Sequence, residues 1–247
     1  MIYFTAQDNF VKALDEVKTL IDLASQNSND NKKYSLFLRA GILFLTTKLE
    51  VFLENISKEY VGKITKCDVS CNNLAEEMIL SAINEHLSKS HIIPQLQRDK
   101  TKCLNIPQLQ AKKTECLKEL RAILPLLDPT EKVTKLDVNT RFNYGKHGKE
   151  EVENLFERIG HKGIFDKCSI SKKQLTYNAE SQQDINIIGD LEALKNIRNK
   201  IIHEDYISTN LTPFQIQGYL DNLTLFADKV SEHLNNELVR LRNVNSP

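Results

Sequence analysis

The residues best suited to chemistry lie in one short stretch, "RNKIIHED", at positions 198–205. Four residues separate Arg198 from His203, and Asn199 directly follows the arginine. A guanidinium stays charged and can donate two parallel hydrogen bonds to an anion, whereas a histidine side chain gains or loses a proton near neutral pH. Together these groups can hold an anion and move a proton beside it.

Arg198 interrupts an apolar stripe of the helix that we predict here. At about 100° per residue, one side of this helix collects Leu191, Leu194, Ile197, Ile201 and Ile202. Arg198 falls between the last two. A guanidinium at a core margin needs an acid, solvent or a bound anion. Two interpretations follow from spacing alone. Either Arg198 reaches solvent or an acid while His203 interacts with the helix C-terminus, or Arg198, Asn199 and His203 form a functional cluster.

The elements that position these residues are predicted to be almost all helical. Glycine occurs 8 times and proline 6 times, and strand-like alternation is rare. Apolar residues recur at helical spacing in five segments, at about 5–24, 34–61, 73–87, 184–206 and 212–243. The second is apolar around most of its circumference, which predicts a central position in the fold.

Capping patterns predict where several of these helices begin. Thr5 with Asp8 fits a capping box for the first helix. Ser181 or Asp184 is the expected start of the fourth. The fifth has the clearest signal, with a threonine cap, a proline in the first turn and a glutamine three residues after the cap, at Thr212, Pro213 and Gln215.

These segments predict an all-α fold in a single domain spanning 1–247. Core helices at about 5–90 and 184–242 would pack as one bundle, since that arrangement buries every apolar stripe. The region at about 91–183 is predicted to be an insertion of short helices and loops, partly irregular.

Composition limits the broad class of protein. The 33 basic residues balance 33 acidic ones, so an anionic ligand must be held by a local patch. The first residues lack a secretory signal, and no apolar run is long enough to span a membrane. The 5 cysteines are scattered, which is typical of reduced thiols. We therefore expect a cytoplasmic protein with no membrane partner.

Two other patterns are weaker. The spacing of Cys67, Cys71, His86 and His91 resembles that of a zinc site, but one predicted helix fills the space between cysteines and histidines, which favours buried thiols and surface histidines. The "GKHGKEE" segment at 145–151 is not a phosphate-binding loop. Its Lys146 and His147 can contact RNA or form a solvated basic loop.

Three stretches resemble the HEPN superfamily. "IRNKIIHED" at 197–205 resembles its R-x(4-6)-H signature, including the asparagine after the arginine. "FLRAGILFLTTKLEVFLENISKEY" at 37–60 resembles a helix with an internal acid in the RiboL-PSP-like branch of HEPN proteins, and "YGKHGKEEVENLFERIG" at 144–160 resembles a segment that precedes the signature there.

The resemblance implies a helical bundle that pairs as a homodimer through the helix carrying Arg198 and His203. It also implies a metal-independent endoribonuclease, acting without a cofactor as a toxin or phage-defence effector. In such an enzyme His203 would serve as acid or base, Arg198 would stabilise the strained phosphate, and Asn199 would orient one of them. An antitoxin or a sister HEPN protein is a possible partner.

Two questions stay open at the sequence level. Glu50 shares a helix face with Arg39 and Thr46. In a purely structural interpretation, Arg39 pairs with an acid or the whole face lies in solvent. In the functional interpretation, Glu50 orients Arg198 or His203. The second question concerns activity, because some HEPN relatives are inactive. The alternative is a non-catalytic helical module that binds RNA, a nucleotide or a protein, such as the neutralising or scaffold member of a toxin–antitoxin pair.

Overall fold

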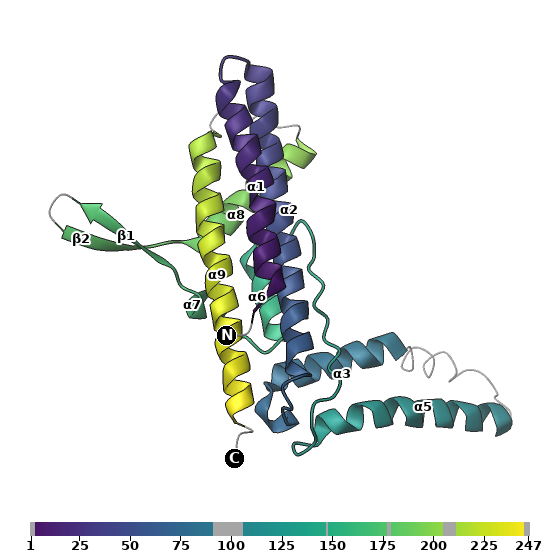
Figure 1. Cartoon of the computed structure of the whole chain (residues 1–247). Coiled ribbons are helices and arrows are strands. Elements are labelled where there is room, and N and C mark those ends of the chain that lie inside the picture. The colour runs from purple at the N-terminus through teal and green to yellow at the C-terminus, as the bar shows by residue number, and fades with distance from the viewer. Residues whose placement is uncertain (1–2, 91–105, 147, 177–178, 205–210, 245–247) are drawn as a thin grey trace.

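The computed structural model describes residues 3–90, 106–146, 148–176, 179–204 and 211–244. Long helices dominate these ranges, so the predicted helical bundle is confirmed. In Figure 1, the three longest helices near the N- and C-termini stand side by side, with α8 behind them. These four helices are α1 (Thr5–Gln26), α2 (Asn31–Ile64), α8 (Ile187–His203) and α9 (Pro213–Asn243).

Helix α2 lies at the centre of the core, as its apolar sequence predicts. Asp30 caps its N-terminus by accepting hydrogen bonds from the backbone N–H groups of Lys32 and Lys33. Its buried apolar side chains are spread along much of the helix, and they include Leu38, Ile42, Leu45, Leu49, Phe52, Leu53 and Ile56. Polar residues that lie among these side chains, such as Thr46, Glu50 and Ser57, are therefore buried as well.

The capping box predicted at the start of α1 is wrong. The cap residue is Phe4, which offers no side-chain hydrogen bond. The carboxylate of Glu59 on α2 instead accepts hydrogen bonds from the N–H groups of Thr5 and Ala6, at 3.0 Å each. A tertiary contact thus satisfies donors that a local cap would otherwise have to satisfy.

The two C-terminal helices begin at different kinds of cap. At α9, the predicted capping box between Thr212 and Gln215 is confirmed, with Pro213 in the first turn. Helix α8 begins later than predicted. Its cap is Asn186, whose side chain accepts a hydrogen bond from the N–H of Gly189.

The middle of the chain is more regular than predicted. It contains α5 (Ile106–Leu127), α6 (Lys149–Arg158) and α7 (Ile164–Lys167), and α3 (Glu76–Ser90) precedes it after the short 3-10 helix η1 (Cys71–Asn73). Helices α3 and α5 project sideways from the base of the bundle in Figure 1. One face of α5 carries exposed apolar residues, namely Ile106, Leu109, Leu117, Leu120, Leu124 and Leu127.

A two-stranded antiparallel hairpin was not predicted. Strand β1 (Ser171–Thr176) pairs with β2 (Ala179–Asp184) in the register Ser171 to Asp184 and Thr176 to Ala179, and the hairpin projects away from the bundle (Figure 1). Its sequences, SKKQLT and AESQQD, lack the apolar alternation that marks a half-buried strand.

Across the described residues, no helix is long and apolar enough to span a membrane.

Candidate functional site

Arg198 lies in the second half of α8, and its side chain is partly buried. Its Nη1 donates a hydrogen bond to Oδ1 of Asn199 at 3.3 Å. Within the described ranges, no carboxylate comes within ion-pair distance of Arg198, so the acid pair considered from the sequence does not form there. The positive charge has a neutral neighbour and can attract an anion.

A tight turn at 143–146 packs directly against this guanidinium. The N–H of Lys146 donates to the carbonyl oxygen of Asn143 at 3.0 Å, and Gly145 has a φ of 88°. An ideal Cβ on Gly145 would lie 2.9 Å from Nη1 and 3.1 Å from Nη2 of Arg198. The left-handed backbone therefore favours glycine here, and a side chain at this position would displace the guanidinium.

Two acids of α2 hold this turn. Oε1 of Glu50 accepts a hydrogen bond from the N–H of Gly145 at 2.6 Å, and Oε2 of Glu54 accepts one from the N–H of Phe142 at 3.0 Å. Glu50 is only 2% exposed, so the solvent-facing strip considered from the sequence is wrong for this residue. The chain of contacts from Glu50 through Gly145 to Arg198 links α2 to α8.

His203 is the last residue of α8 and is exposed. Five positions separate it from Arg198, which corresponds to about 140° around a helix. In the described part of the chain, no hydrogen bond joins the two side chains. The structure thus brings Arg198 and Asn199 together, while His203 points to a different sector of the same helix. Ile202, predicted to lie in the apolar stripe, is 47% exposed.

Of the two residues predicted as RNA contacts, Lys146 is exposed at the end of the turn that touches Arg198. His147 lies outside the described residues. Sequence reasoning missed Gly145 and Glu54, which support the Arg198 side of the site. Glu50 and Glu54 are four residues apart on an apolar helix, so they lie on the same face. This spacing could have predicted that both acids contact the same segment.

The zinc-like spacing does not correspond to a cluster among the described residues. The thiol of Cys67 donates to the carbonyl oxygen of Lys63, and the thiol of Cys71 donates to that of Pro125. His86 pairs instead with Glu119 at 2.8 Å. His91 lies outside the described residues.

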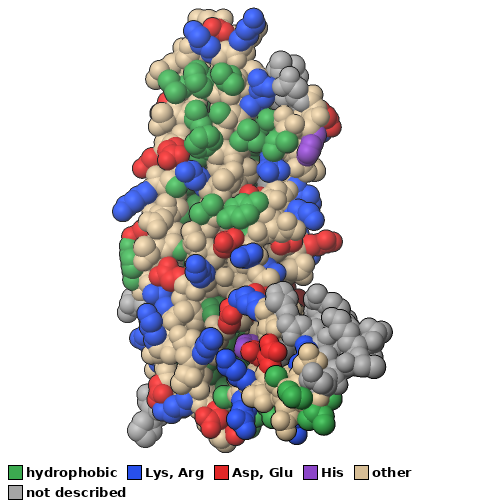
Figure 2. Space-filling view, turned by 90° about the vertical axis from the view of Figure 1, so that its right-hand side faces the viewer, with side chains coloured by type: hydrophobic (Ala, Val, Ile, Leu, Met, Phe, Trp, Pro, Cys, Tyr) green, Lys and Arg blue, Asp and Glu red, His purple; other side chains and the backbone are tan. Residues whose placement is uncertain are grey.

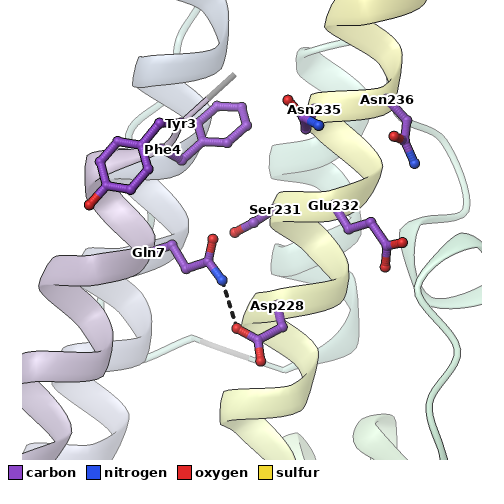
Figure 3. A pocket seen from close by; sticks show the side chains of 8 residues that line it. All are labelled: Tyr3, Phe4, Gln7, Asp228, Ser231, Glu232, Asn235 and Asn236. Carbon is purple, nitrogen blue, oxygen red and sulfur yellow. Dashed lines mark hydrogen bonds between the residues drawn. The ribbon is translucent and has the colours of Figure 1, made fainter. Parts of the chain in front are cut away.

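A pocket of about 300 Å³ lies between the N-terminal segment and α9 (Figure 3). Gln7 Nε2 donates to Oδ1 of Asp228 at 2.7 Å on one side, and Glu232 also lines the pocket. Its lining contains neither Arg198 nor His203. Two carboxylates in this pocket disfavour a phosphate ligand, so we do not place the site there.

Another polar group is buried where α6 ends. His161 is 4% exposed, and its Nδ1 lies 3.1 Å from Nε2 of His233. Burial, followed by the nearby positive charges of His233 and Lys167, lowers the pKa of His161 to about 3. Its imidazole is therefore neutral in the fold at ordinary pH, which suits a structural role.

The charges on one face of the fold are mixed. Figure 2 shows one face on which lysine and arginine side chains alternate with aspartate and glutamate side chains, and no continuous basic field covers the part of this face that is described. On this face, contact with a polyanion would therefore depend on individual basic side chains.

A helical bundle with Arg198 and His203 near the end of its penultimate long helix has the layout expected of a HEPN-type protein. The model of the RiboL-PSP-HEPN family matches residues 8–236, and the chain belongs to this family. The resemblance inferred from three stretches is thereby confirmed. No curated protein and no solved structure matches the chain.

Proposed function

We propose that this protein is a metal-independent endoribonuclease that uses Arg198 and His203 in a cleft between two copies of the chain. One observation carries the proposal. A partly buried guanidinium, held by a glycine turn, has no acidic partner within ion-pair distance among the described residues. Membership of a HEPN-type family adds support, because HEPN domains commonly dimerise and bind RNA.

The reaction needs only groups that the chain can supply. The ribose 2′-hydroxyl attacks the adjacent phosphorus, a base accepts its proton, and an acid protonates the departing 5′-oxygen, which leaves a cyclic 2′,3′-phosphate. His203 of one copy would act as base and His203 of the other as acid. Arg198 would stabilise the negative charge that develops on the nonbridging oxygens, and Asn199 would orient the guanidinium.

A dimer would bring together two residues whose side chains do not meet within a single chain. About 140° of helix separates Arg198 from His203, so the two side chains leave one α8 in different directions. Two α8 helices packed against each other would bring the arginine of one copy toward the histidine of the other. The same contact would cover Ile202, which is 47% exposed beside His203.

Glu50 and Lys146 would support the site in different ways. Glu50 would act as a positioning residue, since it holds the N–H of Gly145 and thereby the surface on which Arg198 rests. Lys146 is exposed at the end of the same turn and would contact a neighbouring phosphate. The biological setting that we propose is a toxin or phage-defence effector of the cytoplasm, restrained by an antitoxin or a sister HEPN protein.

The second candidate is a non-catalytic module that binds RNA, a nucleotide or a protein partner, as the neutralising or scaffold member of a toxin–antitoxin pair does. The separation of His203 from Arg198 within one chain favours it, because a binding site needs the arginine alone. Balanced charge is also compatible with this function.

An RNA digestion in EDTA distinguishes the two functions. The purified chain, Arg198→Ala and Arg240→Ala would be incubated with tRNA and total RNA, and product ends would be analysed. Arg240 pairs with Glu237 on α9 and serves as the control. Nuclease action predicts cyclic phosphate ends for the wild type and Arg240→Ala, and little product for Arg198→Ala. Binding without breakage supports the module, and cleavage by Arg198→Ala at the wild-type rate refutes the assigned role.

A further inference from the structure

Tyr144 is an exposed aromatic side chain beside the arginine of the proposed site. It is 52% exposed. The next residue, Gly145, lies against the Arg198 guanidinium. Because consecutive Cα atoms lie about 3.8 Å apart, the tyrosine is anchored within one residue of the point where Arg198 would hold a phosphate.

The tyrosine ring is held from one side. Its centroid lies 6.5 Å from that of Phe142, at an interplanar angle of 82°, and Phe142 is buried. Partial burial, followed by the negative charge of Glu54 and a hydrogen bond to it, raises the pKa of Tyr144. The ring thus packs against Phe142 on one side, while about half of the side chain remains open to a ligand.

The backbone beneath the ring is also fixed. Glu50 accepts a hydrogen bond from the N–H of Gly145, and Glu54 accepts one from the N–H of Phe142, so the backbone is tied to α2 one residue after and two residues before Tyr144. The turn closes through the Lys146 to Asn143 hydrogen bond. A ring that is positioned before binding loses little conformational entropy when a ligand stacks on it.

The charges around the ring select the part of a nucleotide that can lie there. Glu54 accepts a hydrogen bond from the N–H of Phe142, against which the Tyr144 ring packs, so its negative charge lies near the tyrosine and would disfavour a phosphate there. A nucleobase is uncharged and stacks readily on an aromatic face. The phosphate of a nucleotide would thus lie at Arg198, and its base would lie on Tyr144.

We propose that Tyr144 is a stacking platform for an unpaired base next to the phosphate that Arg198 holds. A base inside a duplex is already stacked and cannot reach a side chain on a surface turn, whereas bases in loops and single strands can. The inference rests on the proposed function, since it uses Arg198 as the phosphate ligand.

Binding and cleavage measured on the same sequence test the proposal. The probe is a short fluorescent RNA with 2′-O-methyl riboses, which cannot be cleaved, used single-stranded and annealed to its complement. The unmodified single strand gives KM and kcat. The variants are Tyr144→Ala, Tyr144→Phe and, as a control, Tyr3→Ala, which removes a 60% exposed tyrosine that lines the pocket beside α9.

The platform predicts that Tyr144→Ala weakens binding of the single strand and raises KM by roughly 5- to 150-fold, as for loss of one stacked base. Tyr144→Phe and Tyr3→Ala should behave like the wild type, kcat should change less than KM, and duplex binding should not respond. A merely structural tyrosine would lower thermal stability and leave this strand preference unchanged.

The outcomes separate the two proposals. If the wild type cleaves RNA and Tyr144→Ala keeps its KM and affinity, the platform is refuted and the nuclease stands. If the wild type binds the single strand without cleaving RNA, and Tyr144→Ala binds it less well, the platform stands and the nuclease is refuted. A wild type that neither binds nor cleaves RNA refutes both.

Discussion

Gly145 and Arg198 are in direct contact, although 53 positions separate them in the sequence. The glycine has a φ of 88°, and the space where its side chain would lie is occupied by the guanidinium. The turn at 143–146 is therefore the surface that determines where the positive charge of Arg198 lies.

Replacing Gly145 with alanine should displace Arg198. The new Cβ would strain a left-handed backbone, at a cost of about 1–2 kcal/mol, and would push the guanidinium from its position. We expect RNA cleavage to fall by about 10- to 100-fold, as for a misplaced catalytic group. Single-turnover cleavage and urea unfolding measure the two effects.

Gly62→Ala is the matched control for this change. Gly62 lies in α2, and nothing lies within 4 Å of the position where its Cβ would be. Alanine in a helix should stabilise the fold by about 0.5–1 kcal/mol and leave cleavage unchanged. Equal cleavage rates for Gly145→Ala and Gly62→Ala would show that the turn does not position Arg198.

Removal of the Glu50 carboxylate should loosen the same turn. Glu50→Ala leaves the N–H of Gly145 without its acceptor, which should lower the free energy of unfolding by about 1–3 kcal/mol. Cleavage should fall in kcat, because the guanidinium loses its support. Both quantities would be measured below the unfolding temperature of the variant.

Glu59→Ala provides the comparison for Glu50→Ala. Glu59 lies on the same helix and also accepts backbone N–H groups, but those of Thr5 and Ala6. Its loss should destabilise the fold by about 0.5–2 kcal/mol, as for loss of a helix cap, without changing kcat. A parallel fall in kcat for both variants would mean that Glu50 acts through general stability alone.

A charge at Ile202 should prevent dimerisation. Ile202→Glu places a carboxylate in the surface that two α8 helices would share, so the chain should become monomeric and cleavage should be lost together with the dimer. The control is Leu80→Glu, which changes a 63% exposed residue of α3 away from α8. This variant should remain dimeric. Light scattering gives the mass of each, and a monomeric wild type that still cleaves RNA would contradict the shared cleft.

Acid should destabilise the fold through His161. Its pKa is lowered to about 3 in the folded chain, whereas an unfolded histidine titrates near 6.5. Between these two pKa values the unfolded state therefore binds more protons than the folded state. The contribution of neutral, buried His161 to the free energy of unfolding is fully present above about pH 6.5 and is lost as the pH falls toward 3. The expected slope is up to about 1.4 kcal/mol per pH unit. Urea unfolding at a series of pH values measures it.

The variant His161→Gln isolates this contribution. Between pH 6.5 and 5 its stability should depend less on pH than that of the wild type, because the buried imidazole is gone. Above pH 7 the two profiles should run parallel. Identical slopes in the acid range would show that His161 is not held neutral by burial.

Local patterns predicted the helices well, because their signals lie within a few residues of each other. The capping box of Thr212 and Gln215 and the central position of α2 are examples. The polar strands of the hairpin lack such a signal. The support for Arg198 also escaped sequence reasoning, because Glu50 and Gly145 are 95 positions apart and only the tertiary fold brings them together.

The most direct test of the central claim is the cleavage rate of His203→Ala on a defined single-stranded RNA in EDTA, measured with the folded dimer. The account predicts a loss of about 10²- to 10⁴-fold, as expected for removal of a general acid or base, with unchanged secondary structure and mass. A cleavage rate equal to that of the wild type would contradict it.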